Sequence, residues 1–421
     1  MTMRFSLRRN VAARRGAAVA IWLTMMVPAA GGSDGSQTFE AEHGCVALAN
    51  AVTTQAAGAS AVFVRSYEPG EDESGLPAAL ATSAFVYDNA LAAIALVACG
   101  DVRRAILIGN ALKRAVRNDR TFTDGRVRNA YRAGPLGEGP PALPGWWDKN
   151  QNIWAEDAAQ DGSSTGNAGW TILALLTLHQ ATGDASYLAD AERLMDWVMA
   201  NISSSAGFRG GFHGYDPNTV PILWISTEHN VDIHAAAAWL YRLTGKAKYE
   251  QAAAQAWRFV ERAFAGDHFL LGTKPDGSLA DPAMLALDVQ LWPWMAIADG
   301  PAKWRSALQF AATHLNVGGG FDFNGDRDGV WTEGTAQASL AYRIAGDPVK
   351  SRQLLMELEA DRTPSGFLNA SRIPRLSTGL SIDPTKTGAD FFYFKRPHLG
   401  ATAWATLAAK AWNPFTGKRI D

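Results

Sequence analysis

The sequence predicts an all-α fold, an (α/α)6 toroid of helical hairpins with long loops on one face. Three observations predict it: apolar helices that each close on a glycine, an amphipathic helix after each of these glycines, and no strand-like alternation longer than four residues. Glycine suits the left-handed conformation that often ends a helix, so each pair forms a tight hairpin. The closing glycines are Gly100, Gly183, Gly245, Gly300 and Gly346.

The two ends of the chain supply a sixth hairpin. An amphipathic helix over 40–57 has no partner of its own, and an apolar helix over 399–412 could pair with it and close the ring. Residues 90–98 and 235–240 are small and apolar throughout, as expected of inner helices that are buried on both sides. The amphipathic second helices, expected on the outside, include 185–200, 247–264 and 303–315.

Long segments rich in glycine, proline and aromatic residues precede the inner helices. All the hairpins run in the same direction. The segments before the inner helices are therefore expected to lie on one face of the ring and to form its loops. They cover residues 134–169, 207–227, 271–281, 317–330 and 363–395.

The N-terminal residues are typical of a bacterial export signal. Basic residues are followed by an apolar run over 16–27, which is too short to span a bilayer, and by a small-residue cleavage site at Val27-Pro28-Ala29. We therefore predict a signal peptide over 1–29, a flexible linker over 30–38 and a single catalytic domain over 39–421. The expected location is periplasmic or secreted, and a retained N-terminal anchor is the alternative.

Composition limits the possible partners. The formal net charge of −2 gives no reason to expect binding to nucleic acid or to an anionic membrane. No other apolar stretch reaches membrane-spanning length, so we expect no stable membrane insertion after signal cleavage, and we expect a monomer. Cys45 and Cys99 could pair in an oxidising compartment, but both lie in apolar helical patterns where buried free thiols are also common.

Polar residues collect at the start of every predicted inner helix. Any one of the acids could be a helix cap or a first-turn acid, favoured by the helix dipole. That interpretation explains neither the accompanying tryptophans nor the polar residues beyond the caps. The segments are 85–90, 154–157 with 165–170, 224–232, 287–292, 330–337 and 393–404. The hairpin layout places all these starts at one end of the ring, so they form a candidate site.

Acids on opposite walls of a ring suit glycoside cleavage, which needs one protonated and one ionised carboxyl group. We predict Glu228, Glu333 and Asp88 as catalytic residues, with Glu228 as general acid and Asp88 or Glu333 as base. Among the 15 tryptophans, the predicted sugar platforms are Trp146, Trp147, Trp154, Trp224, Trp292 and Trp331. The predicted substrate-binding residues are Tyr87, Asn89, Trp154, Asp157, Trp224, His229, Asn230, Asp232, Asp288, Gln290, Trp292, Trp331, Tyr393, Arg396 and His398.

The hairpin pattern resembles the six-hairpin glycosidase superfamily of bacterial carbohydrate-active enzymes. The segments that carry the likeness are Tyr87-Asp88-Asn89, Thr227-Glu228-His229-Asn230, Trp331-Thr332-Glu333-Gly334-Thr335 and the closing Thr402-Ala403-Trp404. The likeness is architectural, covers nearly the whole mature chain and includes no signature of the endoglucanases, glucoamylases or unsaturated glucuronyl hydrolases. It implies a carboxylate active site at the rim that acts on a poly- or oligosaccharide.

Three other functions remain open. A toroidal polysaccharide lyase would use His229, Asn230, Tyr393, Arg396 and His398 to bind a uronate and remove its C5 proton. A sugar isomerase or epimerase would need two rim histidines. A carbohydrate-binding protein of an exopolysaccharide system would keep the tryptophans without needing the acids.

The sequence gives little reason to expect a metal ion or an organic cofactor, and we predict neither. Residues 322–328 carry acids at alternate positions, as in a calcium-binding loop, but Arg327 interrupts the pattern. We interpret this segment as a turn before the fifth inner helix.

Overall fold

The computed structural model describes residues 41–69, 75–297, 300–384, 386, 388 and 391–420. The predicted signal peptide over 1–29 and linker over 30–38 lie outside these residues. The α-helices in the described part of the chain are α1 Ala41–Ala56, α2 Val86–Ala98, α3 Val102–Arg117, α4 Ala158–Asp161, α5 Thr165–Thr182, α6 Ala185–Asn201, α7 Thr227–Thr244, α8 Ala247–Ala263, α9 Leu287–Ala296, α10 Ser306–His314, α11 Thr332–Ile344, α12 Pro348–Leu358 and α13 Leu399–Ala409.

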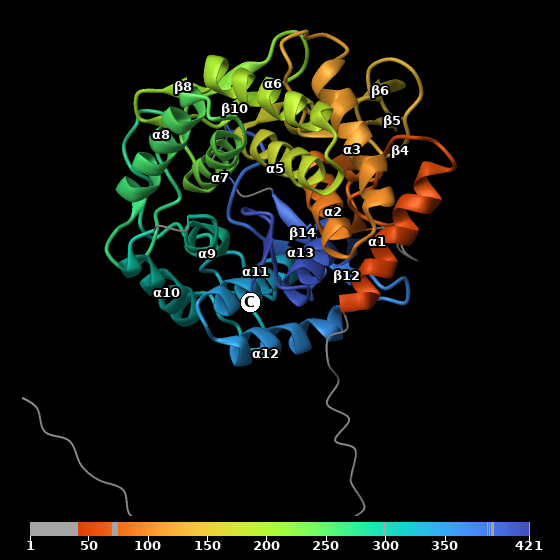
Figure 1. The fold of residues 1–421 in the computed structure, drawn as a ribbon. Coiled ribbons are helices and arrows are strands. Elements are labelled where there is room, and N and C mark those ends of the chain that lie inside the picture. The colour runs from red at the N-terminus through yellow and green to blue at the C-terminus, as the bar shows by residue number, and fades with distance from the viewer. Residues whose placement is uncertain are drawn as a thin grey trace, which may run out of the picture. The chain divides into compact units, whose positions relative to one another are not determined.

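The predicted (α/α)6 toroid is confirmed. The inner helices α2, α5, α7, α9, α11 and α13 each pack against the next one, and α13 packs against α2 and closes the circle (Figure 1). The helices α3, α6, α8, α10 and α12 each follow an inner helix and pack outside it. The inner helices are rich in alanine and buried almost throughout, so the core is continuous between the two rings.

The sixth hairpin joins the two ends of the chain, as predicted. Helix α1 packs on α13, and the contact is so close that a Cβ at Gly44 would lie 2.1 Å from Thr406 Oγ1. A disulfide between Cys45 and Cys99, with Cα atoms 5.8 Å apart, ties α1 to the C-terminal end of α2. The first helix is therefore held both to the hairpin that follows it and to the last helix of the chain.

Glycines end four of the inner helices in the left-handed conformation that the sequence predicts. Gly183 and Gly245 have φ angles of 73° and 65°, and their N–H groups donate to carbonyls of the last turn. Gly100 and Gly346 also have positive φ angles, of 84° and 81°. The prediction does not hold at Gly300. Helix α9 ends earlier, at Ala296, shortly after Pro293, which has no N–H for a helical hydrogen bond.

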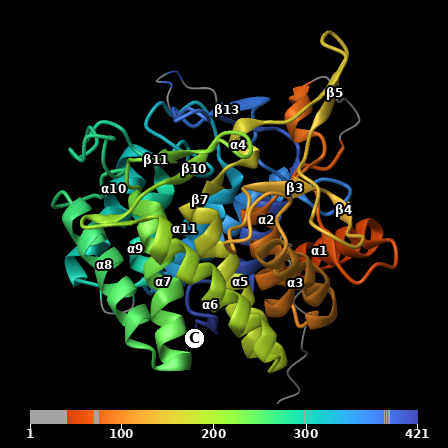
Figure 2. The same ribbon diagram turned by 90° about the horizontal axis from the view of Figure 1, so that it is seen from above.

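Short strands pair antiparallel within and between the loops, and several of them lie at one end of the ring (Figure 2). The strands pair as β1 with β4, β2 with β3, β5 with β6, β10 with both β7 and β11, β8 with β9, β12 with β15, β13 with β14 and β16 with β17. Their bounds are β1 Val62–Phe63, β2 Ser83–Phe85, β3 Ala130–Arg132, β4 Gly134–Pro135, β5 Trp146–Asp148, β6 Ile153–Ala155, β7 Ser163–Ser164, β8 Ser203–Ser204, β9 Gly207–Phe208, β10 Gly211–His213, β11 Val220–Ile222, β12 Leu368–Asn369, β13 Arg375–Ser377, β14 Phe392–Phe394, β15 Pro397–His398, β16 Trp412–Asn413 and β17 Lys418–Arg419.

A repeated side-chain clamp fixes these loops to the inner helices. In five inner helices the fourth residue accepts a hydrogen bond from a backbone N–H in the loop that follows the preceding outer helix. The pairs are Asn89 with Val64, Asn230 with Phe208, Gln290 with Phe269, Thr335 with Phe321 and Thr402 with Leu368, all at 2.8–2.9 Å. Since buried backbone groups need partners, the fourth residue is polar although it faces the interior.

Within the described residues, no helix combines the length and the apolar character that crossing a membrane requires.

Candidate active site

The second residues of the inner helices point into the hollow of the ring. Tyr87, Gly166, Glu228, Asp288 and Glu333 hold this position in α2, α5, α7, α9 and α11, and all five line a cavity of about 570 Å³. The other cavity residues that the sequence predicted are Asp88, Asp157, His229, Trp292, Trp331, Tyr393 and His398. The helix starts therefore do converge on one hollow.

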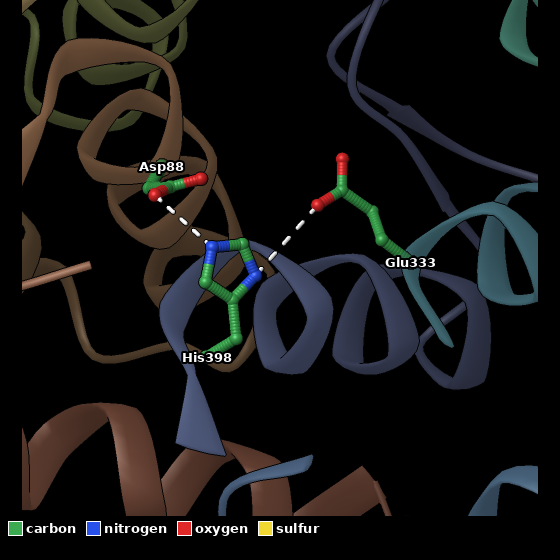
Figure 3. A group of neighbouring side chains, drawn as sticks. All are labelled: Asp88, Glu333 and His398. Carbon is green, nitrogen blue, oxygen red and sulfur yellow. Dashed lines mark ion pairs between the residues drawn. The ribbon is translucent and has the colours of Figure 1, made fainter. Parts of the chain in front are cut away.

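Asp88, His398 and Glu333 form the centre of the site, with the imidazole between the two acids (Figure 3). His398 Nε2 lies 3.4 Å from Asp88 Oδ2, and its Nδ1 lies 3.9 Å from Glu333 Oε2. The three side chains are buried, with 1–4% of their surface exposed. Each offers one ligand-type atom, and these atoms lie within 4.8 Å of one another.

The hydrogen bonds of His398 define its tautomer. Its Nδ1 accepts the N–H of Ala401 at 3.2 Å, because His398 caps the N-terminus of α13. The ring proton is therefore on Nε2, directed at Asp88. Burial lowers the pKa of His398, but the Asp88 carboxylate outweighs burial and the pKa is raised. With both nitrogens engaged, the ring presents no free lone pair to a metal ion.

Glu333 is held by one carboxyl oxygen, and its other oxygen is buried without a partner among the described residues. Its Oε1 accepts hydrogen bonds from the Tyr87 hydroxyl at 2.6 Å and from Gln337 Nε2 at 3.3 Å. Its Oε2 has no hydrogen-bond partner among the described residues. Burial raises the pKa of Glu333 to about 8, and the negative charge of Asp88 contributes. At neutral pH Glu333 therefore carries a proton. Because Oε1 already accepts two hydrogen bonds, this proton is on Oε2.

Glycine at the second position of α13 makes this arrangement possible. A Cβ at Gly400 would lie 2.5 Å from Asp88 Oδ1 and 2.9 Å from Glu333 Oε2. Any side chain there would push apart the two carboxyl groups, so Gly400 is required for their approach.

A second group of acids comes from α7 and α9. Burial raises the pKa of Glu228 well above its usual range, and the charges of Asp288 and Glu333 add to the effect. Burial also raises the pKa of Asp288, to about 7. Glu228 is half-buried and lines the cavity, so it can contact a ligand there.

Aromatic rings form much of the remaining wall. Trp292 stacks on Tyr87 with ring centroids 6.5 Å apart and meets Trp170 edge to face at 5.4 Å. The ring centroids of Trp331 and Tyr393 lie 5.3 Å apart, and both residues line the cavity with Glu333. Trp170, Trp292 and Trp331 are each only 1% exposed, so they support the wall from behind. The partly exposed rings of Tyr87 and Tyr393 are the ones that can meet the C–H faces of a sugar.

Several predicted substrate-binding residues do not line the cavity. Asn89, Asn230 and Gln290 are the fourth residues of their helices, so their amides clamp loop backbone instead. Asp232 is fully buried behind the cavity wall, in close contact with α5. A Cβ added at Gly169 would lie 2.7 Å from the Cβ of Asp232. The other three predicted residues that do not line the cavity are Trp154, Trp224 and Arg396.

Two predicted sugar platforms lie on an exposed hairpin. Trp147 and Trp154 face each other across β5 and β6, and 52% and 44% of their surfaces are exposed. The guanidinium of Arg132 lies 4.7 Å from the ring of Trp154. In Figure 2 this hairpin projects from the end of the ring at which β10, β11 and β13 lie.

Sequence reasoning missed residues that reach the cavity from loops and from the short helix α4. Tyr67 packs on His398 with ring centroids 4.5 Å apart, and Asn129, Gln160 and Phe391 also line the cavity. Their segments follow no helical period, so nothing in the sequence indicated where they would lie. Trp170 was detectable, because it follows the first turn of an inner helix.

Comparisons with solved structures support the fold. A glycosidase matches with a TM-score of 0.58 and 16% identity, over 87% of this chain and 96% of its own. A GH76 α-mannanase from Bacteroides thetaiotaomicron matches at 0.54 and 14%, over 88% and 96%. A sugar epimerase from a ruminal bacterium matches at 0.58 and 13%, over 88% and 98%. No family model and no curated protein matches the sequence. The chain therefore has the six-hairpin, glycosidase-like (α/α)6 fold.

Proposed function

We propose that the protein is an exported glycoside hydrolase that acts on an oligo- or polysaccharide in the cavity at the N-terminal ends of the inner helices. The observation that carries the proposal is a carboxylate supported by an imidazole, Asp88 with His398, in a cavity that also contains protonated carboxyl groups. This division of roles is the one that glycosidic hydrolysis requires.

We assign the proton donor to Glu228 and the base to Asp88. Glu228 comes from α7, whereas Asp88 and Glu333 both lie beside the start of α13, so Glu228 is the acid best placed on the other side of a bound sugar. Its raised pKa favours the protonated form that a proton donor needs. The N–H of His398 stabilises the negative charge on Asp88.

The reaction balances with these two groups and water. Glu228 transfers its proton to the glycosidic oxygen as the bond between that oxygen and the anomeric carbon breaks. Asp88 accepts a proton from a water molecule whose oxygen bonds to the same carbon. Glu333 is not required to change its protonation state. Tyr87 and Gln337 hold its Oε1 by hydrogen bonds, and its buried Oε2 lies 3.9 Å from His398 Nδ1.

The lining favours a neutral sugar over a uronate. Among the described cavity residues there are five acids and neither lysine nor arginine. A uronate carboxylate would find no lysine or arginine to pair with in this lining, and burial of an anion without such a partner is unfavourable. Arg396, which a polysaccharide lyase would need, is not among the cavity residues. These observations support a hydrolase over the lyase alternative.

The comparisons and the N-terminus support the rest of the proposal. Solved glycosidases, one of them in complex with glucose, and a GH76 α-mannanase are similar in fold to this chain. The basic and apolar segments at the start of the sequence support export. The pairing of Cys45 with Cys99 is what an oxidising compartment would permit.

Product analysis tests the reaction class. The mature protein is incubated with neutral and acidic bacterial and plant polysaccharides, and the products are identified by mass. Hydrolysis adds one water for each bond cut, whereas elimination adds none and creates an ultraviolet-absorbing double bond. Water addition on a neutral glycan is the expected result. An unsaturated product would replace the proposal with a lyase.

Leaving-group dependence tests the two roles. On natural substrates, Glu228→Gln and Asp88→Asn are each expected to lose activity by orders of magnitude. A substrate with a good leaving group, such as a glycosyl fluoride, needs no proton donor, so it should restore much of the rate of Glu228→Gln but not that of Asp88→Asn. If Glu333→Gln showed this restoration and Glu228→Gln did not, the donor would be Glu333.

A sugar epimerase is the second candidate, favoured by two cavity histidines. His229 and His398 both line the cavity, and burial lowers the pKa of His229 to about 4, which leaves it neutral and able to accept a proton. A solved sugar epimerase shares the fold. An epimerase would leave substrate mass unchanged in H₂O and incorporate deuterium at carbon from D₂O. A hydrolase forms no carbon-bound deuterium.

A further inference from the structure

A cluster of three acids lies in the loop that leads into α11, away from the carboxyl groups of the cavity. Asp322, Asp326 and Asp328 each offer a carboxylate oxygen, and these oxygens lie within 4.8 Å of one another. Asp322 is fully buried, whereas Asp326 and Asp328 are exposed. Three negative charges this close repel one another unless a cation or a shared proton lies between them.

The buried member of the cluster has an oxygen without a partner. Asp322 Oδ1 accepts the N–H of Phe323 at 2.7 Å, but Oδ2 has no hydrogen-bond partner among the described residues. The Asp322 carboxyl group faces Asp326 and Asp328. A fully buried carboxylate oxygen that lacks a donor and faces two other carboxylates suits a cation as its partner.

The exposed members are held in place with free oxygens remaining. Asp326 Oδ1 accepts the N–H of Asp328, and Asp328 Oδ2 accepts the N–H of Ser377. No hydrogen bond from another described residue reaches the other oxygen of either carboxylate, so it is available to a ligand. Arg327, the basic residue within the loop, donates to the carbonyl of Asn316 and does not neutralise the cluster.

We propose that Asp322, Asp326 and Asp328 bind a Ca²⁺ ion. The donors are all oxygens, which excludes the softer metals, and an irregular loop suits the flexible coordination of Ca²⁺ better than the strict octahedron of Mg²⁺. The three acids stand at the first, fifth and seventh positions counted from Asp322. Arg327, at the sixth, has a φ of 59°, the left-handed conformation for which calcium loops use glycine. Glu333, at the twelfth position, lies in the cavity, so water would complete the coordination.

The proposed ion would brace one wall of the cavity. The loop carbonyl of Phe323 accepts the N–H of Leu287 at the start of α9, next to Asp288. The ring of Phe323 packs against Trp331 at 4.9 Å and Tyr393 at 6.3 Å, both of which line the cavity. Asp328 connects the loop to β13 through Ser377. The role is structural and does not depend on the chemistry proposed for the cavity.

The test is metal binding by the full mature protein after removal of metal with a chelator. Isothermal titration with CaCl₂ is expected to give one site with a Kd on the order of 10⁻⁴ M or tighter, and saturating Ca²⁺ is expected to raise the Tm. Asp326→Asn and Asp328→Asn keep the shape of exposed side chains and should fold. Each is expected to weaken binding at least tenfold and to reduce the Tm shift.

Asp276→Asn is the matched control, since Asp276 is an exposed loop acid that accepts the N–H of Ser278. This variant should bind Ca²⁺ as the wild type does. Absence of both heat and a Tm shift in the wild type would show that the acids share a proton and would overturn the proposal. Unchanged affinity in Asp326→Asn and Asp328→Asn, or equal affinity for Mg²⁺, would also overturn it.

Discussion

Replacing Glu333 by glutamine should make stability respond to pH in a way that reveals the buried proton. Burial raises the pKa of Glu333 from 4.5 to about 8 in the folded state. Between these values the folded state binds a proton that the unfolded state releases, so the free energy of unfolding falls as the pH rises. Glutamine has nearly the same shape and its oxygen can accept the hydrogen bonds of Tyr87 and Gln337, but it does not titrate.

The size of the effect follows from the shift. One pKa unit corresponds to about 1.4 kcal/mol. The free energy of unfolding of the wild type is therefore lower by about 1 kcal/mol at pH 5 and by about 3 kcal/mol at pH 7 than when Glu333 is fully protonated in both states. The loss approaches about 5 kcal/mol above pH 8. The Glu333→Gln variant avoids this loss, so its stability relative to the wild type should rise by about 2 kcal/mol between pH 5 and pH 7.

Urea denaturation at pH 5, 6, 7 and 8 measures the difference directly. Asp281→Asn, which changes an exposed loop acid, is the control and should show no such trend. A difference between Glu333→Gln and the wild type that stayed constant with pH would refute the reasoning. It would mean that Glu333 is ionised at neutral pH, and Glu333 would then compete with Asp88 for the role of base.

Three further predictions test the loop clamp, the exposed hairpin and the disulfide. Asn230→Ala leaves the backbone N–H and C=O of Phe208 without partners, so urea denaturation should show a loss of about 2–5 kcal/mol. Trp147→Ala should raise the KM for a long polysaccharide several-fold and leave the KM for a short oligosaccharide unchanged, because this exposed ring lies outside the cavity. Equal effects on both substrates would exclude an outer subsite. Reducing the Cys45–Cys99 bond, which spans 54 residues, should lower the free energy of unfolding by up to about 4 kcal/mol, and a reductant that left the Tm unchanged would contradict this.

The sequence was sufficient to predict the ring and the end of it that carries the site, because both depend on helix period and on glycine. It was not sufficient to assign individual rim residues. Successive helical residues turn by about 100°, so Glu228, second in α7, lines the cavity, whereas Asn230, two residues later, clamps Phe208. Helix starts read from sequence are uncertain by more than two residues, so these two roles could not be told apart.

The loops were harder still. Tyr67 reaches the cavity from a segment between α1 and α2, and no local pattern places it against His398. Gly400 gave a detectable signal, a glycine in the first turn of an apolar helix, but its meaning depends on two carboxyl groups from other helices. Pairings of this kind arise only when the hairpins assemble, so they cannot be predicted from one segment.

The cavity is complete only when the hairpin of α1 and α13 has closed the ring. Its imidazole is contributed by the N-terminus of α13, the same helix whose packing against α1 and α2 completes the ring. A polypeptide that stops before residue 398 would therefore lose a functional group and the closure of the toroid together. Formation of the complete pocket therefore requires that α13 dock against α1 and α2.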